Sequence, residues 1–199
     1  SSDPSDGLKR VAELKQMIMA LHDEGIRVIM DVVYNHMYDA GWSAFEALAP
    51  GYYFRTDGTG KFTNGSGCGN GTASGRPKGG KFMIDPLKYW LTEYKVDGFR
   101  FDLMGLHDVD TMNAIAAELK KINPYVMLYG EGWTGGESSL SPSRRATIEN
   151  AKLMPDIAVF DDIIRDGVKG GVFDIREKGY VSGGRGLYAP FVGIAGGTD

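Results

Sequence analysis

The chain has 199 residues, of which 42% are hydrophobic and 24% are charged, and its formal net charge is −4. This length and composition predict a globular protein with a hydrophobic core. The small net charge is spread without long runs of one sign, which gives no reason to expect nucleic acid or an anionic membrane as a partner. No apolar stretch reaches about 18 residues, so no membrane span is expected. Cys68 is the only cysteine, so no internal disulfide can form.

Helical and strand-like segments alternate from the start of the chain. Leucine, valine and isoleucine recur at helical spacing over residues 8–21, and Gly25 is a natural stop for that helix. The strand-like run 26–33 follows and is apolar nearly throughout, as expected for a strand covered on both faces. Residues 37–80 are expected to form a long loop with aromatic residues and a glycine-rich tail. A loop of this kind often builds a binding cleft.

The middle of the chain repeats the alternation. The next helix is predicted to begin at Pro86, with Asp85 as its N-terminal cap, because proline is tolerated in the first turn. A strand over 96–102 follows. A helix over 109–122 comes next, with Asp108 as its N-cap.

The last part of the pattern is shorter. A third strand is predicted over 125–131 and a fourth over 157–160, followed by a short helix over 161–169. No element is predicted beyond Gly170. Strands that alternate with helices indicate an α/β protein with a parallel sheet and helices packed outside it.

Two of the strand-like runs end on a carboxylate. The run 98–101 leads to Asp102, and the run 125–130 leads to Glu131. Because these strands are separated by about one βα unit, they are expected to be neighbours that aim both carboxylates at the same spot. Glycoside hydrolysis needs such a pair, one as nucleophile and one as proton donor. Arg100 leaves its strand on the same side as Asp102, where a guanidinium would orient the carboxylate.

Three segments carry a resemblance to a known family. They are residues 31–36 (DVVYNH), 98–102 (GFRFD) and 130–133 (GEGW). In this order they resemble the first three signature regions of the α-amylase superfamily of glycoside hydrolases. The flanking residues 103–108 and 66–74 are most similar to those of type I pullulanases, which cleave α-1,6-glucosidic bonds.

The resemblance implies a fold and an activity. The fold is a TIM (β/α)₈ barrel, of which this chain supplies about strands 3 to 6 with their helices and a long loop after strand 3, so that residues 1–199 form the central part of an incomplete catalytic domain. The activity is retaining hydrolysis of α-1,6-glucosidic bonds in pullulan and in branched α-glucans such as starch and glycogen. Isoamylase, branching enzyme and α-amylase activities remain open, as does a truncated, non-catalytic α-glucan-binding protein. The isolated chain is expected to be inactive.

The resemblance also implies roles for single residues. Asp102 matches the nucleophile and Glu131 the general acid and base. The residues expected to bind substrate are His36, Arg100, Asp31, Trp133 and Tyr34. No metal ligand and no required cofactor are expected, although Asn35 matches a calcium ligand of many α-amylases and leaves calcium possible. His107 and Asp108 are expected to provide a loop contact and a helix cap rather than an acid–base pair, and nothing matches the family's third catalytic aspartate.

Overall fold

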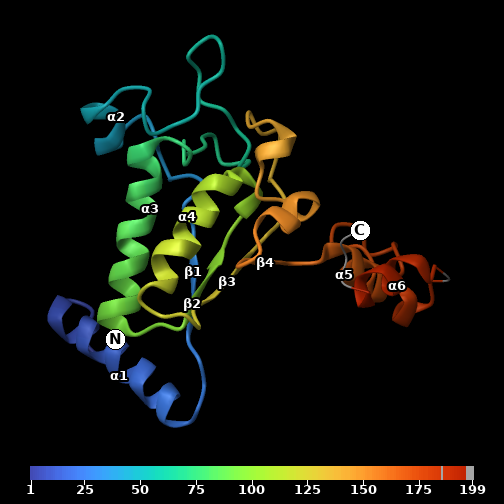
Figure 1. The fold of residues 1–199 in the computed structure, drawn as a ribbon, viewed down its shortest axis with the longest axis horizontal. Helices are drawn as coiled ribbons and strands as arrows, with labels where there is room; N and C mark the ends of the chain where they lie inside the picture. Colours follow the sequence, from blue (N-terminus) through green and yellow to red (C-terminus); the bar gives the residue numbers. More distant parts are fainter. Residues whose placement is uncertain (185, 196–199) are drawn as a thin grey trace.

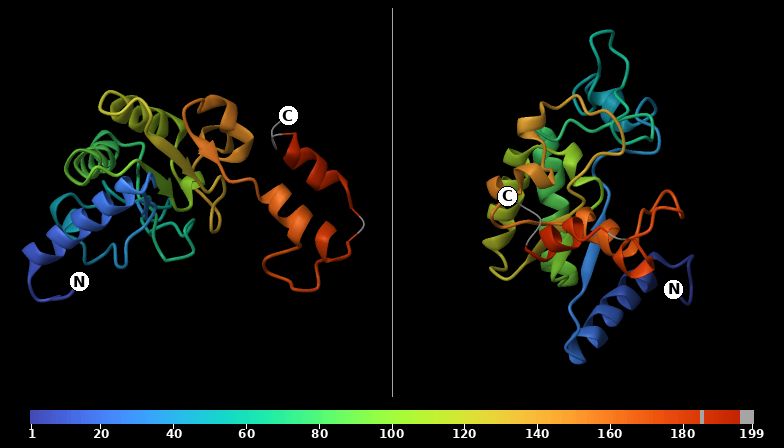
Figure 2. Two further views of the ribbon diagram at one scale, coloured as in Figure 1. Left: turned by 90° about the horizontal axis from the view of Figure 1, so that it is seen from below. Right: turned by 90° about the vertical axis from the view of Figure 1, so that its right-hand side faces the viewer.

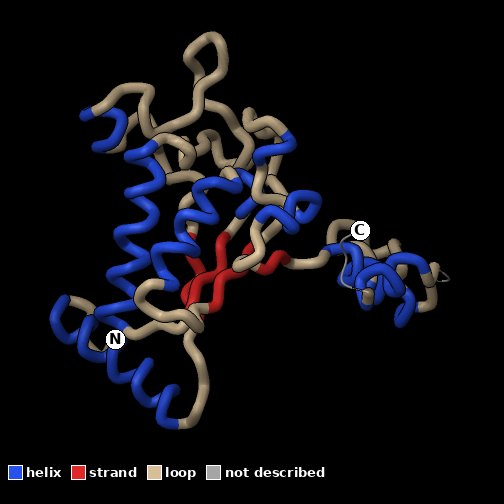
Figure 3. The backbone as a smooth tube through the Cα atoms, viewed as in Figure 1, coloured by secondary structure: helices blue, strands red, loops and turns tan. Residues whose placement is uncertain are grey.

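The computed structural model describes residues 1–184 and 186–195, and its centre is a parallel sheet of four strands (Figure 3). The strands lie in the order of their numbers and comprise β1 (Ile29–Val32), β2 (Gly98–Phe101), β3 (Met127–Gly130) and β4 (Ala158–Val159). Every neighbouring pair is parallel, and the register sets Asp31 beside Arg100 and Arg100 beside Tyr129. The predicted parallel sheet is therefore confirmed, although each strand is shorter than its apolar run.

Two helices, α3 (Pro77–Tyr89) and α4 (Val109–Lys120), pack together on one face of this sheet (Figure 1). Side chains alternate between the faces of a strand, so Phe99 and Phe101 face the helices while Arg100 faces the other way. The large fully buried members of the core include Leu87, Phe99, Phe101, Met104, Met112, Ile115, Leu119 and Met154. Burying each such side chain contributes about 1.5–3 kcal/mol. Strand β2 thus supplies the core on one face and a charged residue on the other.

Only one face of the sheet is covered by helices in the described part of the chain. The expectation that β1 is covered on both faces was wrong, since the Asp31 side chain is 64% exposed. The apolar residues around Asp31 are explained by one face only: Val32 is buried in the core, and Val28 and Met30 pack against it. The uncovered face carries the polar residues described below.

Helix α3 begins earlier than predicted. Pro77 lies in its first turn, and Pro86 lies inside the helix. The prediction that Asp85 caps and Pro86 opens this helix was therefore wrong, and the preceding loop ends at residue 76 instead of residue 80. Pro86 has no N–H to donate within the helix, but burial of the adjacent Leu87, which is 0% exposed, favours the helix through this point. A π-helical turn, η1 (Trp90–Tyr94), follows directly.

The other elements place loops around the ends of the strands. Helix α1 (Gly7–Asp23) forms as predicted, and Gly25 follows its end with φ of +74°, a backbone angle that favours glycine. The loop after β1 contains the short helix α2 (Ala44–Leu48) and lies beyond the carboxyl ends of the strands (Figure 1). Three 3₁₀ turns complete this region: η2 (Met104–Leu106), η3 (Pro142–Arg144) and η4 (Ile148–Leu153).

The last elements stand apart from the sheet (Figure 2). Helix α5 (Asp162–Lys169) forms close to its predicted range, with Asp161 as N-cap. The turn η5 (Tyr180–Ser182) and the helix α6 (Tyr188–Ile194) were not predicted, and α6 packs against α5. Among the described residues, no helix combines the length and the apolar character needed to cross a membrane.

Candidate active site

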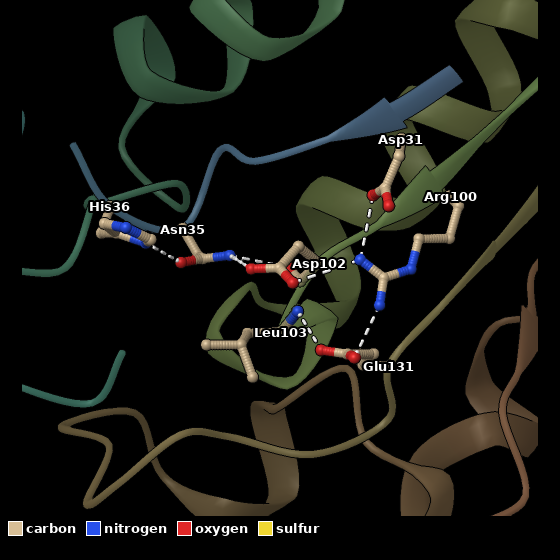
Figure 4. A network of polar contacts seen from close by, with 7 residues as sticks. All are labelled: Asp31, Asn35, His36, Arg100, Asp102, Leu103 and Glu131. Carbon is tan, nitrogen blue, oxygen red and sulfur yellow. Dashed lines mark hydrogen bonds and ion pairs between the residues drawn. The ribbon is translucent and has the colours of Figure 1, made fainter. Parts of the chain in front are cut away.

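Three carboxylates on neighbouring strands share one guanidinium: Asp31 lies within β1, whereas Asp102 and Glu131 follow the ends of β2 and β3 (Figure 4). Arg100 donates from Nη1 to Asp31 Oδ1 at 2.9 Å and to Asp102 Oδ1 at 3.1 Å, and from Nη2 to Glu131 Oε1 at 2.6 Å. The side chains of Arg100, Asp102 and Glu131 are 20%, 27% and 17% exposed, so solvent screens these contacts only in part. Burial lowers the pKa of Arg100, but the surrounding carboxylates outweigh burial and raise this pKa above its usual value. The structure therefore places both predicted catalytic carboxylates on one cation.

The backbone after β2 also holds Glu131. Leu103 N–H donates to Glu131 Oε2 at 2.9 Å, and Glu131 N–H donates to the Phe101 carbonyl at 3.0 Å. Leu103 has φ of 40° and ψ of 49°, a left-handed conformation that leucine rarely adopts. Backbone strain of this kind concentrates at functional sites. Sequence reasoning did not identify this role for Leu103, because no residue type in the segment signals a left-handed turn.

A second set of hydrogen bonds reaches Asp102 from the segment after β1 (Figure 4). Asn35, which is 1% exposed, donates from Nδ2 to the Asp102 carbonyl at 2.7 Å and to Asp102 Oδ2 at 2.9 Å. Its Oδ1 lies 2.5 Å from His36 Nδ1. Among the described contacts, His36 is therefore joined to Asp102 through Asn35. Sequence reasoning assigned Asn35 no role beyond the calcium resemblance, although its place beside His36 at the end of a strand was a usable signal.

The contacts of Asn35 test whether this residue could bind the calcium ion that the family resemblance left possible. Calcium takes about six to eight oxygen ligands, but the Asn35 oxygen faces His36 and its nitrogen faces Asp102. Within residues 1–184 and 186–195, no group of three or more His, Cys, Asp or Glu side chains is placed to hold a metal ion. The residues around Asn35 therefore do not fit a calcium ion.

The aromatic candidate Tyr34 lies away from the carboxylates. Its ring meets Phe82 of α3 edge-on, with the ring centroids 6.4 Å apart. Burial raises the pKa of the Tyr34 hydroxyl to about 12. The structure thus places Tyr34 against the helix layer, whereas it brings Asp31, Arg100, Asp102 and Glu131 together.

Aromatic side chains also lie beside the end of β4. Phe160 follows this strand, and its ring centroid is 5.8 Å from the Arg100 guanidinium. Trp133 lies near it, with centroids 6.4 Å apart, and the Arg165 guanidinium is 5.5 Å from the Trp133 ring. Sequence reasoning missed Phe160 because an aromatic residue at the end of an apolar strand is usually part of a core.

His107 and Asp108 have separate environments. Asp108 caps α4 by accepting from Thr111 N–H at 2.9 Å, and it also accepts from Ser74 Oγ at 3.1 Å. His107 is 1% exposed, and neither of its ring nitrogens has a hydrogen-bond partner in the described part of the protein. Burial lowers the pKa of His107 to about 4. The expected cap is confirmed, and the imidazole is buried in its neutral form.

Comparisons with known proteins identify relatives of this chain. No family model matches the chain. Over 98% of its length the chain is 46% identical to the pullulanase of Bacillus subtilis strain 168, and it spans 27% of that protein. It also resembles the crystal structure of a pullulanase from Anoxybacillus sp. LM18-11 complexed with maltotriose, with a TM-score of 0.94 and 49% identity over 99% of this chain and 28% of that one.

A second solved structure gives the same result. The pullulanase of Paenibacillus barengoltzii in complex with maltohexaose and α-cyclodextrin has a TM-score of 0.85 and 47% identity, covering 89% of this chain and 27% of that one. Fold and sequence together place the chain among the glycoside hydrolases of the α-amylase family. Within that class the chain is pullulanase-like, as the residues flanking its motifs predicted. It spans about a quarter of the length of these relatives.

Proposed function

We propose that this chain carries the catalytic carboxylates of a debranching enzyme that hydrolyses α-1,6-glucosidic bonds in pullulan and in branched α-glucans. The observation that supports this most directly is the pair Asp102 and Glu131, held on Arg100 at the ends of neighbouring parallel strands. The pullulanase relatives support the class of substrate, and two of the similar crystal structures hold malto-oligosaccharides.

The proposed reaction has two steps and retains the configuration of the sugar. Asp102 attacks the anomeric carbon while the glycosidic C–O bond breaks, and Glu131 gives its proton to the departing oxygen. A glycosyl ester on Asp102 results. Glu131 then takes a proton from water, the water oxygen attacks the anomeric carbon, and the ester bond to Asp102 breaks.

Glu131 must exchange a contact before it can act as the acid. Both of its oxygens accept a hydrogen bond, one from Leu103 N–H and one from Arg100 Nη2. The Leu103 donor belongs to the backbone, whereas the Arg100 side chain also has Asp102 and Asp31 as partners. We propose that the contact with Arg100 Nη2 is released when substrate enters.

The remaining site residues are proposed to hold the sugar. His36 binds the glucose unit at the point of cleavage, and Trp133 offers an aromatic face to a sugar ring. Arg100 and Asp31 orient the nucleophile, and Tyr34 supports the segment that carries His36.

We further propose that β1 to β4 are about the third to sixth strands of a (β/α)₈ barrel, and that residues 1–199 are the central part of its catalytic domain. The parallel sheet and the similarity to segments of full pullulanases support this. Strands β1 and β4 each have one unpaired edge among the described residues. Unpaired edges favour association, so the isolated chain is proposed to be inactive.

The test uses the protein that contains this chain, incubated with pullulan, a polymer of maltotriose units joined by α-1,6 bonds. Maltotriose should accumulate, and Asp102→Asn should reduce kcat by at least about 1000-fold, because the nucleophile is lost. Asp110→Asn is the matched control, because this aspartate on α4 is 84% exposed and its nearest partner is Arg144 at 3.5 Å. Release of maltotriose by Asp102→Asn at the rate of the control would refute the assignment.

A further inference from the structure

One buried amide joins the predicted sugar ligand to the predicted nucleophile. Asn35 is 1% exposed and follows β1, whereas Asp102 follows β2. Three hydrogen bonds use the Asn35 side chain: two from Nδ2 to Asp102 and one between Oδ1 and His36 Nδ1. A buried polar group is costly unless it is satisfied, so an amide in this position is held firmly in one orientation.

The orientation of this amide follows from its partners. The backbone carbonyl of Asp102 can only accept a hydrogen bond, so the Asn35 nitrogen must face it. The Asn35 oxygen therefore faces His36 and can only accept, so His36 Nδ1 carries a hydrogen. His36 Nε2 remains for another partner.

Asn35 also binds the carboxylate oxygen of Asp102 that Arg100 leaves free. Arg100 binds Oδ1 at 3.1 Å, and Asn35 binds Oδ2 at 2.9 Å. With a donor on each oxygen, rotation of the carboxylate is restricted from both sides.

We propose that Asn35 is a positioning residue that fixes the plane of the Asp102 carboxylate and the hydrogen position on His36. This rests on the proposed function, because it assigns Asp102 as the nucleophile and His36 as a sugar ligand. Both polar atoms of the Asn35 side chain are engaged by Asp102 and His36, so the proposal gives Asn35 no contact with the sugar. Its effect therefore falls on the rate of the chemical step more than on binding.

A second buried asparagine provides a matched control. Asn70 is 3% exposed and binds the same segment, accepting from Met37 N–H at 3.0 Å and donating to the Met37 carbonyl at 2.7 Å. These contacts hold the loop in place, and the Asn70 side chain has none with Asp102 or His36. A purely structural role for Asn35 predicts that the two asparagines respond alike to substitution.

The experiment measures kcat and KM on pullulan for the protein that contains this chain, with the unfolding midpoint of each variant. Asn35→Ala should lower kcat on the order of 100-fold, because a catalytic group loses its alignment, and change KM by less than about threefold. Asn70→Ala should lower the unfolding midpoint but leave kcat within about threefold. If Asn35→Ala does not fold, Asn35→Ser, an uncharged change that is too short to reach both Asp102 and His36, decides by the same measurement.

A double-mutant cycle tests the link to His36. The losses of kcat/KM from Asn35→Ala and His36→Ala should not multiply, because part of each loss comes from the same hydrogen bond. Fully multiplicative losses, or a kcat for Asn35→Ala no lower than that of Asn70→Ala, would overturn the inference. Failure of the proposed function looks different, since the unsubstituted protein would then release no maltotriose or Asp102→Asn would remain active.

Discussion

A single methyl group at Gly130 should disturb the site without removing any polar side chain. A Cβ at this position would lie 2.6 Å from the Phe101 carbonyl oxygen and 3.0 Å from Met104 Cβ. The same carbonyl accepts the N–H of Glu131 at 3.0 Å. Widening the new contact from 2.6 Å to an ordinary 3.4 Å requires a shift of about 0.8 Å. The backbone anchor of Glu131 must move with it.

The size of the effect follows from that shift. Overpacking costs about 1–3 kcal/mol, and replacing glycine by alanine offsets about 0.4–1 kcal/mol through the unfolded chain. We expect Gly130→Ala to lower the free energy of unfolding by about 1–2 kcal/mol in net terms. Misplacing a catalytic group by about 1 Å costs about 100-fold in rate, so kcat/KM on pullulan should fall by about 30- to 100-fold.

The assay combines urea unfolding with pullulan kinetics on the protein that contains this chain. Gly58→Ala is the matched control, because a Cβ at Gly58 meets no atom within 4 Å. If Gly130→Ala behaves like Gly58→Ala in both measurements, the close approach of β2 and β3 does not position Glu131.

Two further predictions concern the residues that precede α4. Asp108→Ala removes a buried acceptor from Thr111 N–H and Ser74 Oγ and should lower the free energy of unfolding by about 2–3 kcal/mol in urea; a loss no greater than that of the exposed Asp110→Ala would contradict this. The pKa of His107 is about 4 in the folded protein against a usual 6.5, so the unfolded chain takes up the proton first and stability falls as pH drops from about 6.5 to about 4. In His107→Leu the free energy of unfolding should therefore fall by roughly 3 kcal/mol less between neutral and acid pH than in the unsubstituted protein. If both proteins lose the same free energy of unfolding over this pH range, the role of His107 is refuted.

The sequence was sufficient for the sheet and for the pairing of the carboxylates. Apolar runs that end on Asp102 and Glu131 are joined by one helix, and a short right-handed crossover leaves such strands as parallel neighbours. Their ends must then lie at the same edge of the sheet. The helix cap at Asp108 was equally predictable, because a short acidic side chain before an apolar periodic run satisfies free N–H groups.

Other features depend on contacts that no local pattern encodes. Pro86 was expected to begin a helix, but burial of the residues around it outweighs its missing hydrogen bond. The left-handed Leu103 is set by the turn that joins β2 to η2, against the preference of leucine itself. Asn35 acquires its role only when β1 and β2 lie side by side, and helix α6 is held by α5.

Two hydrogen-bond donors orient Asp102, the nucleophile of the proposed reaction. A carboxylate has about four lone-pair positions, and Arg100 and Asn35 occupy one on each oxygen. Arg100 alone would leave Oδ2 free to rotate, whereas both donors together fix the plane and leave the remaining lone pairs for an incoming anomeric carbon. One donor belongs to β2 and the other follows β1, so the orientation of the nucleophile depends on how these two strands pair and is not a property of the β2 motif by itself.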